Sequence, residues 1–271
     1  MNKICAFGDS VMKGIVEDCS RLAGSVKYMI SNLSFAEICS SRLGLDIRNY
    51  ARFGGTINQG MDLVEKHKDD VSDSRYCVIE YGGNDCSYHW DEISQDPVSV
   101  HNPLTMLGDF RRQYSAMIDR ICKIGAKPVL LSLPLIDSER YFKHITKGLN
   151  PENILKWLGG DVDFIGHWHD MYNMAVWKLG AAKGVPVIDI TSPFLVRKDY
   201  RDYLCSDGIH PNEEGHRIIA DAICDFVNTN KNYSYILQNN IFGSGSDPLY
   251  AGDWMVTVTD AVSKTYTVEV R

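Results

Sequence analysis

The sequence has neither a long hydrophobic run nor an excess of basic residues. None of its apolar stretches approaches the roughly 18 consecutive apolar residues of a membrane-spanning helix, so we expect no membrane span. The 35 acidic residues outnumber the 28 Lys and Arg residues, and this balance argues against a nucleic-acid partner, which needs a basic face. The remaining composition, 44% apolar and 23% charged over 271 residues, is typical of a soluble globular protein.

The eight cysteines include no CxxC pair and lie scattered among apolar neighbours. This scatter favours buried thiols in a reducing compartment over a set of four disulfides. The amino terminus passes from Met1 to Lys3 straight into a strand-like segment, which leaves no room for a signal peptide. We therefore expect a cytoplasmic protein.

Short apolar or β-branched runs alternate with longer helical patterns along most of the chain, without an internal repeat. This alternation predicts a parallel sheet with helices on both faces. Ser34 is placed to cap a helix, with Glu37 three residues later. We predict strands at 3–7, 46–50, 76–81, 128–133 and 185–190, and helices at 34–43, 56–67, 104–124, 167–182 and from 211 to about 227.

The composition changes after the last predicted helix. Residues 228–240 are rich in Asn and Lys, and 243–248 form a turn-rich break. Two alternating segments, 254–259 and 264–270, predict a β-hairpin. We therefore predict a main domain at 1–229 and an extension at 230–271. Because a lone hairpin is marginal in water, we expect it to dock on the main domain or on another subunit of a homo-oligomer.

A serine follows the first predicted strand, in the stretch Phe7–Ser10. The carboxyl ends of strands are where open α/β sheets place their ligand crevice. Asp207 and His210 lie three residues apart just before the last predicted helix. A His base activates a serine hydroxyl, and a carboxylate fixes the tautomer of that His, so Ser10, His210 and Asp207 form a candidate catalytic triad. Taken singly, Ser10 or Asp9 also fits a helix cap, and Asp207 fits an Asx turn.

Acyl transfer also needs hydrogen-bond donors for the developing oxyanion. Two more strand-end segments supply them. Gly54, within 49–56, offers a backbone N–H, and Asn84, within 81–85, offers a side-chain amide. The Gly-Gly-Asn-Asp sequence at 82–85 is also typical of a simple turn.

With these segments in this order, the sequence resembles the SGNH/GDSL hydrolase superfamily. The resemblance implies an α/β fold, a flavodoxin-like three-layer sandwich whose five-stranded parallel sheet has the order 2-1-3-4-5, with the hairpin as a small C-terminal β extension. It covers roughly residues 3–228. The four matching motif blocks are Gly8–Ser10, Asn49–Thr56, Gly82–Asp85 and Asp207–Pro211.

The resemblance also implies a role for each candidate residue. Ser10 would be the nucleophile, His210 the general base and then acid, and Asp207 the residue that orients His210. The N–H groups of Ser10 and Gly54 and the side chain of Asn84 would form the oxyanion hole. No metal or organic cofactor is implied. The G-x-S-x-G elbow of α/β-hydrolases is absent around Ser10, which favours the SGNH assignment.

The stretch His167–Asp170 raises the question of a metal site. Residues two apart on a helix point away from each other, so His167 and His169 do not form a chelating pair there. No Cys or carboxylate set completes a site at suitable spacing. We therefore expect no metal.

Two segments, 86–103 and 135–170, look like insertions at the carboxyl ends of strands, where substrate contacts concentrate. Their aromatic side chains either stack on a sugar, line an acyl pocket, or cover the sheet edge as core. These residues are Tyr88, Trp90, Tyr141, Phe142, Trp157 and Trp168.

Their aromatic and polar character, without a long exposed aliphatic stretch, favours a serine esterase that removes a short acyl group. Acetyl on a carbohydrate or another small polar carrier is the substrate that we expect. A lysophospholipase or a thioesterase is the alternative, since both belong to the superfamily. From another class, a catalytically silent carbohydrate-binding or assembly module also stays open.

Overall fold

The computed structural model describes residues 2–18, 27–238, 254–259 and 265–270. The chain divides into two compact units, Met1–Val227 and Asn228–Arg271. No helix among the described residues combines the length and the apolar character needed to cross a membrane. None of the seven cysteines in these ranges forms a disulfide, and all of them except Cys122 are buried.

The first unit is built on a five-stranded parallel sheet with the order β4-β1-β5-β6-β7. Counted along the chain, these strands have the order 2-1-3-4-5, so the predicted fold is confirmed. The interior strand β1 carries the apolar run Ile4–Phe7, because helices cover it on both faces. The strands are β1 (Asn2–Gly8), β4 (Leu45–Asn49), β5 (Tyr76–Glu80), β6 (Lys127–Leu131) and β7 (Val187–Ile188).

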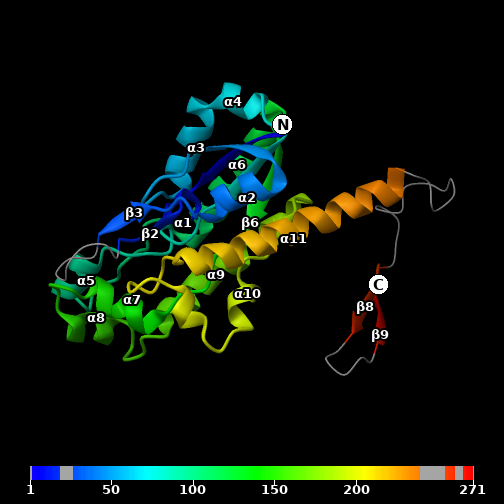
Figure 1. Ribbon diagram of the computed structural model, residues 1–271. Coiled ribbons are helices and arrows are strands. Elements are labelled where there is room, and N and C mark those ends of the chain that lie inside the picture. The colour runs from blue at the N-terminus through cyan, green and yellow to red at the C-terminus, as the bar shows by residue number, and fades with distance from the viewer. Residues whose placement is uncertain (1, 19–26, 239–253, 260–264, 271) are drawn as a thin grey trace. The chain divides into compact units, whose positions relative to one another are not determined.

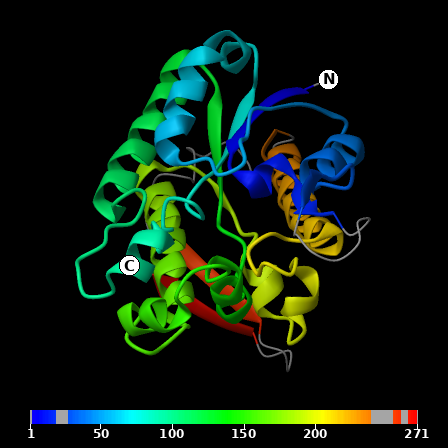
Figure 2. The same ribbon diagram turned by 90° about the vertical axis from the view of Figure 1, so that its left-hand side faces the viewer.

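Helices form the two outer layers of this sandwich. Figure 2 shows α3 (cyan) and α6 (green) on one side of the strands, and α2 (blue) and α11 (orange) on the other. One core cluster packs α3, α6 and α9 against the sheet, and a second packs α2 and the first half of α11 against its opposite face. The bounds are α2 (Phe35–Leu43), α3 (Ile57–Lys66), α4 (Lys68–Ser72), α6 (Leu107–Ile124), α9 (Phe164–Lys183) and α11 (Glu213–Gln238).

A local sequence signal sets the start of α2 as predicted. The Ser34 side chain accepts a hydrogen bond from the backbone N–H of Glu37 and caps α2. The strand predicted at 185–190 is shorter than expected, because only Val187 and Ile188 pair with β6.

Several short helices and strands were not predicted from the sequence. An antiparallel pair, β2 (Ile15–Glu17) and β3 (Tyr28–Ile30), follows the one-turn helix α1 (Ser10–Lys13). The predicted insertions contain α5 (Trp90–Gln95), α7 (Ser138–Ile145) and α8 (Pro151–Trp157), which Figure 1 shows grouped at one end of the unit. The loop before α11 carries α10 (Ser192–Leu195) and the 3-10 turn η1 (Tyr200–Tyr203).

The second unit contains β8 (Trp254–Thr259) and β9 (Thr265–Val270). They pair antiparallel, with Trp254 opposite Val270, and form the predicted C-terminal hairpin. Its predicted turn, the turn-rich break at 243–248 and Cys19 lie outside the described residues. Docking of the hairpin on another surface stays a prediction.

Candidate active site

A tight strand-to-helix turn presents Ser10 at the carboxyl end of β1. Asp9 caps α1, since its Oδ1 accepts a hydrogen bond from the N–H of Val11 at 2.9 Å. A Cβ on Gly8 would lie 2.5 Å from the Cβ of Met12, so only glycine fits this turn. The capping role therefore belongs to Asp9, which leaves the hydroxyl of Ser10 available for other contacts.

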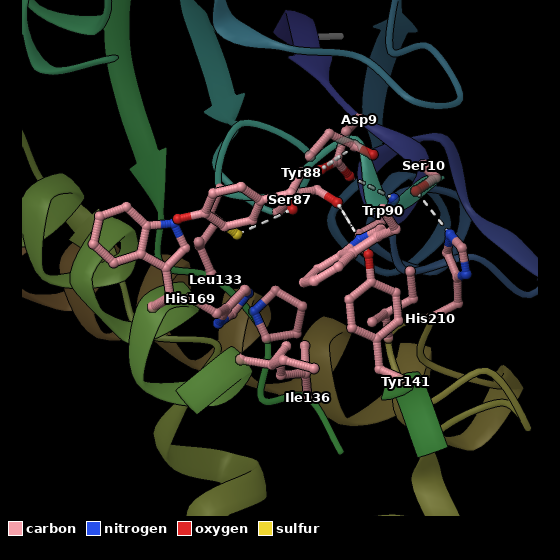
Figure 3. A pocket seen from close by; sticks show the side chains of 18 of the residues that line it. Asp9, Ser10, Ser87, Tyr88, Trp90, Leu133, Ile136, Tyr141, His169 and His210 are labelled. Atoms are coloured by element: carbon pink, nitrogen blue, oxygen red, sulfur yellow. Dashed lines mark hydrogen bonds between the residues drawn. The ribbon is translucent and has the colours of Figure 1, made fainter. Parts of the chain in front are cut away.

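Ser10, His210 and Asp207 form one hydrogen-bonded chain, as the sequence predicts. The Oγ of Ser10 lies 2.8 Å from Nε2 of His210, the contact drawn as a dashed line in Figure 3. Nδ1 of His210 lies 2.7 Å from Oδ2 of Asp207. All three side chains are buried. This is the hydrogen-bond network of a catalytic triad.

Asp207 makes the contacts that both sequence interpretations require, because its two oxygens have different partners. Oδ1 accepts the backbone N–H groups of Ile209 and His210 at 2.9 and 3.1 Å, which is the Asx turn. Oδ2 holds the imidazole of His210. Gly208, which lies between Asp207 and His210 in the chain, has φ +80°, and a Cβ there would lie 2.7 Å from the Cβ of Arg140. Both the backbone conformation and the space require glycine.

The charge on Asp207 fixes the tautomer of His210. Burial raises the pKa of this carboxyl, but hydrogen bonds from His210 and from two backbone N–H groups outweigh burial and hold the pKa below its usual range. An ionised carboxylate only accepts hydrogen bonds, so Nδ1 of His210 carries the proton. Nε2 then has its lone pair toward Ser10, which is the arrangement needed to take the serine proton.

Tyr28 is a site residue that sequence reasoning missed. Its hydroxyl donates a hydrogen bond to Oδ2 of Asp207 at 2.7 Å, and its ring centroid lies 5.0 Å from that of His210. Burial and the bond to Asp207 raise its pKa, so the phenol stays a donor at neutral pH. Phe53 stacks on the same imidazole at 5.9 Å. No motif marks Tyr28, and the β2–β3 pairing brings it to the site.

The candidate oxyanion donors lie on different segments around Ser10. Asn84 lines a pocket together with Ser10, and its Nδ2 donates to Oδ2 of Asp9 at 3.1 Å, which fixes the amide orientation. Gly54 does not line this pocket and sits at φ +68° in an exposed turn. That turn is tied to the end of β1, because the N–H of Arg52 donates to the carbonyl of Gly8. The oxyanion roles stay predictions.

Glu80 and Asp85 are buried carboxyls close to Asp9, and neither has a role predicted from the sequence. Oε2 of Glu80, at the end of β5, accepts the backbone N–H of Asp9 at 3.4 Å. Burial raises the pKa of both side chains, and the Asp9 charge raises that of Glu80 further, well above its usual value. Burial also raises the pKa of Asp85 to about 7, although its carboxylate accepts the N–H of Ile57.

The two predicted insertions meet and form the wall of the pocket beside Ser10 (Figure 3). They share a small apolar core of their own that includes Ile93 and Ile154. The pocket encloses about 740 Å³ of empty space, part of it open to solvent. Phe142 packs in the small core, as the core interpretation expects. The aromatic lining residues are Tyr88, Trp90, Tyr141, Trp157, Phe164 and Trp168.

The two histidines of the candidate metal stretch lie in different surroundings. His169 is buried and lines the pocket, whereas His167 is exposed on the same helix. Within the described ranges, no group of three or more His, Cys, Asp or Glu side chains is arranged to hold a metal ion.

A flavodoxin-like sandwich with a Ser-His-Asp network at the carboxyl ends of its strands defines a class of hydrolases. Comparison with family profiles agrees: residues 6–218 match the GDSL-like Lipase/Acylhydrolase family. The chain belongs to this family. A search of the curated proteins gave no significant match.

Solved structures with the same fold include a lipase/acylhydrolase from Enterococcus faecalis. It has 19% sequence identity and a TM-score of 0.58, over 84% of this chain and 95% of that one. Axe2, an acetylxylan esterase from Geobacillus stearothermophilus, has 16% identity and a TM-score of 0.55, over 82% and 92% of the two chains. At these identities the likeness establishes the fold alone.

Proposed function

We propose that this hydrolase is a serine esterase that forms an acyl-enzyme on Ser10. Its substrate is a short acyl group, such as acetyl, on a carbohydrate or another small polar carrier. The observation that carries the proposal is the continuous chain from Ser10 through His210 to the ionised Asp207, with Ser10 lining a pocket rich in aromatic side chains.

The first half of the reaction forms the acyl-enzyme. Nε2 of His210 takes the hydroxyl proton as Oγ of Ser10 attacks the ester carbonyl carbon. The negative charge that develops on the carbonyl oxygen is stabilised by the N–H groups of Ser10 and Gly54 and by the amide of Asn84. His210, now an imidazolium beside the Asp207 carboxylate, gives its proton to the departing alcohol.

The second half releases the acid. Water enters where the alcohol left, and His210 takes one of its protons as the oxygen attacks the acyl carbon. The same donors stabilise the second tetrahedral intermediate. Ser10 leaves as the acyl–oxygen bond breaks and recovers its proton from His210. One ester and one water become one acid and one alcohol, and the triad returns to its starting state.

The lining of the pocket supports a short acyl group on a polar carrier. Its aromatic side chains carry polar groups, and Oγ of Ser87 lies 3.1 Å from the hydroxyl of Tyr141 and 3.3 Å from Nε1 of Trp90. An acyl chain long enough to reach Trp168 and His169 would leave their Nε1 and Nδ1 atoms without a hydrogen-bond partner, which a polar carrier can supply. Among the structural neighbours, Axe2 is an acetylxylan esterase by its own description.

Activity on p-nitrophenyl acetate, butyrate and octanoate tests the proposed function. We expect the highest kcat/KM with acetate, and loss of activity in Ser10→Ala. A kcat/KM that rises steadily with chain length would favour the lysophospholipase or thioesterase alternative. A folded wild-type protein that cleaves none of the three esters would favour the non-catalytic module.

A further inference from the structure

Two residues that line the pocket each carry a buried polar atom without a hydrogen-bond partner. Trp168 and His169 are neighbours on α9, and both line the pocket. Nε1 of Trp168 and Nδ1 of His169 are buried, and neither bonds to any part of the chain that the structure describes. The His169 side chain, labelled in Figure 3, is 5% exposed. Because buried polar groups in proteins nearly always have partners, this pair points to a ligand that supplies them.

The chemistry of the two side chains limits what that ligand can be. Burial lowers the pKa of His169 to about 4, so its imidazole is neutral, and Nδ1 either donates or accepts according to the tautomer. The indole of Trp168 offers a donor only. No Lys or Arg occurs among the lining residues that the structure describes, so nothing there favours a carboxylate or a phosphate. A hydroxyl group, which both donates and accepts, matches this set.

The walls around these atoms are flat aromatic faces. The ring of Tyr88 lies 4.8 Å from that of Trp157 in an edge arrangement and 6.3 Å from that of Trp168. Aromatic faces pack against apolar C–H surfaces, and polar groups at their edges bond to hydroxyls. A sugar ring offers both kinds of surface. An aliphatic chain in the same place would leave the Trp168 and His169 atoms unpaired.

We propose that this pocket holds the sugar ring of an O-acylated sugar, and that His169 and Trp168 bind its hydroxyl groups. The sugar is then the alcohol that leaves when Ser10 is acylated, and the transferred acyl group is small. This inference rests on the proposed function and adds the binding site of the carrier. His169 is its specificity-determining residue, since it determines which alcohol is accepted and takes no part in proton transfer.

A pair of esters with rings of the same size tests this assignment. One is a mono-O-acetylated methyl pyranoside, and the other is cyclohexyl acetate, which has no hydroxyl groups. We expect the wild type to prefer the sugar ester. His169→Phe keeps a ring but removes both nitrogens, so kcat/KM for the sugar ester falls about 10- to 100-fold, mainly through KM. Activity on cyclohexyl acetate stays within about threefold.

Two further variants show whether the loss comes from the hydrogen bonds. His169→Asn restores a donor and an acceptor near Nδ1, and we expect it to recover part of the activity on the sugar ester. His167→Phe changes an exposed histidine on the same helix and should leave both activities unchanged. Equal losses on both esters in His169→Phe, or a wild type that prefers cyclohexyl acetate, would overturn the assignment while the esterase function stands.

Binding measurements separate this assignment from the catalytic proposal. Three of the five tryptophans, Trp90, Trp157 and Trp168, line the pocket, so their fluorescence reports on its occupancy. In Ser10→Ala protein, a methyl pyranoside should change this fluorescence, with a Kd at least about tenfold weaker when His169→Phe is added. No change on adding sugar to the folded Ser10→Ala protein would refute the assignment, whereas absence of ester hydrolysis refutes the proposed function.

Discussion

Replacing Asp207 by Asn inverts the hydrogen-bond pattern on which the nucleophile depends. The Asp207 carboxylate accepts four hydrogen bonds: two from backbone N–H groups at Oδ1, and one each from His210 and Tyr28 at Oδ2. Asn has one accepting oxygen and one donating nitrogen. Backbone N–H groups cannot turn away, but the Tyr28 hydroxyl can rotate and His210 can change tautomer. The amide nitrogen therefore takes the place of Oδ2.

The consequence is a His210 with the wrong tautomer. A donor facing Nδ1 forces the proton onto Nε2, which then points an N–H at Ser10 and accepts nothing from it. We expect kcat on p-nitrophenyl acetate to fall on the order of 10⁴-fold, the effect of this tautomer change in a Ser-His-Asp site. The change is nearly isosteric, so the chain should remain folded.

The assay is kcat at neutral pH for wild type and Asp207→Asn, with a thermal unfolding curve for each. Asp202→Asn is the matched control, because this exposed Asp lies in the same loop outside the network. A loss of less than about tenfold in folded Asp207→Asn protein would refute the assignment of Asp207 as the residue that orients His210.

Three further variants test other contacts of the site. Tyr28→Phe removes a hydrogen bond to the buried carboxylate of Asp207, so we expect the free energy of unfolding to fall by about 1.5–3 kcal/mol. We also expect the acid limb of the kcat/KM–pH profile to shift to higher pH. An unchanged profile would contradict the role of Tyr28 beside Asp207. Gly8→Ala places a Cβ against Met12, and we expect a destabilisation of about 1–3 kcal/mol, measured by urea unfolding; unchanged stability would contradict the close packing of this turn. Because burial raises the pKa of Asp85 to about 7, its proton stabilises the fold below pH 4, and this contribution is lost as pH rises from about 4 to 7. Asp85→Asn should remove that loss, so its stability relative to wild type should be greater at pH 8 than at pH 5; an equal difference at both pH values would contradict the raised pKa.

The triad could be predicted from the sequence because its signals are local. Ser10 follows a strand that an apolar run identifies, and Asp207 and His210 lie within one turn of each other. The sheet order came from the family resemblance, and the structure confirms it. Short motifs at strand ends can be assigned to one site without knowledge of the packing, because parallel strands bring their carboxyl ends to one edge of the sheet.

Other parts of the site depend on tertiary packing and had no such signal. Tyr28 reaches Asp207 from a strand of three residues, which is too short for a period to be recognised. Glu80 occupies a strand position where only the fold shows that a carboxyl is buried against Asp9. The insertions were predicted to carry substrate contacts, but no pattern predicts that α5 and α8 share one apolar core.

Reaction with a fluorophosphonate, followed by mass spectrometry of the peptides, tests most directly whether Ser10 is an activated nucleophile. The Oγ of an activated serine displaces fluoride from phosphorus and keeps the phosphonyl group. We predict one label per chain, on the peptide that contains Ser10, with none in Ser10→Ala and strongly slowed labelling in His210→Ala. A folded wild-type protein that stays unlabelled, or that carries the label on another residue, would contradict the assignment of Ser10 as the nucleophile.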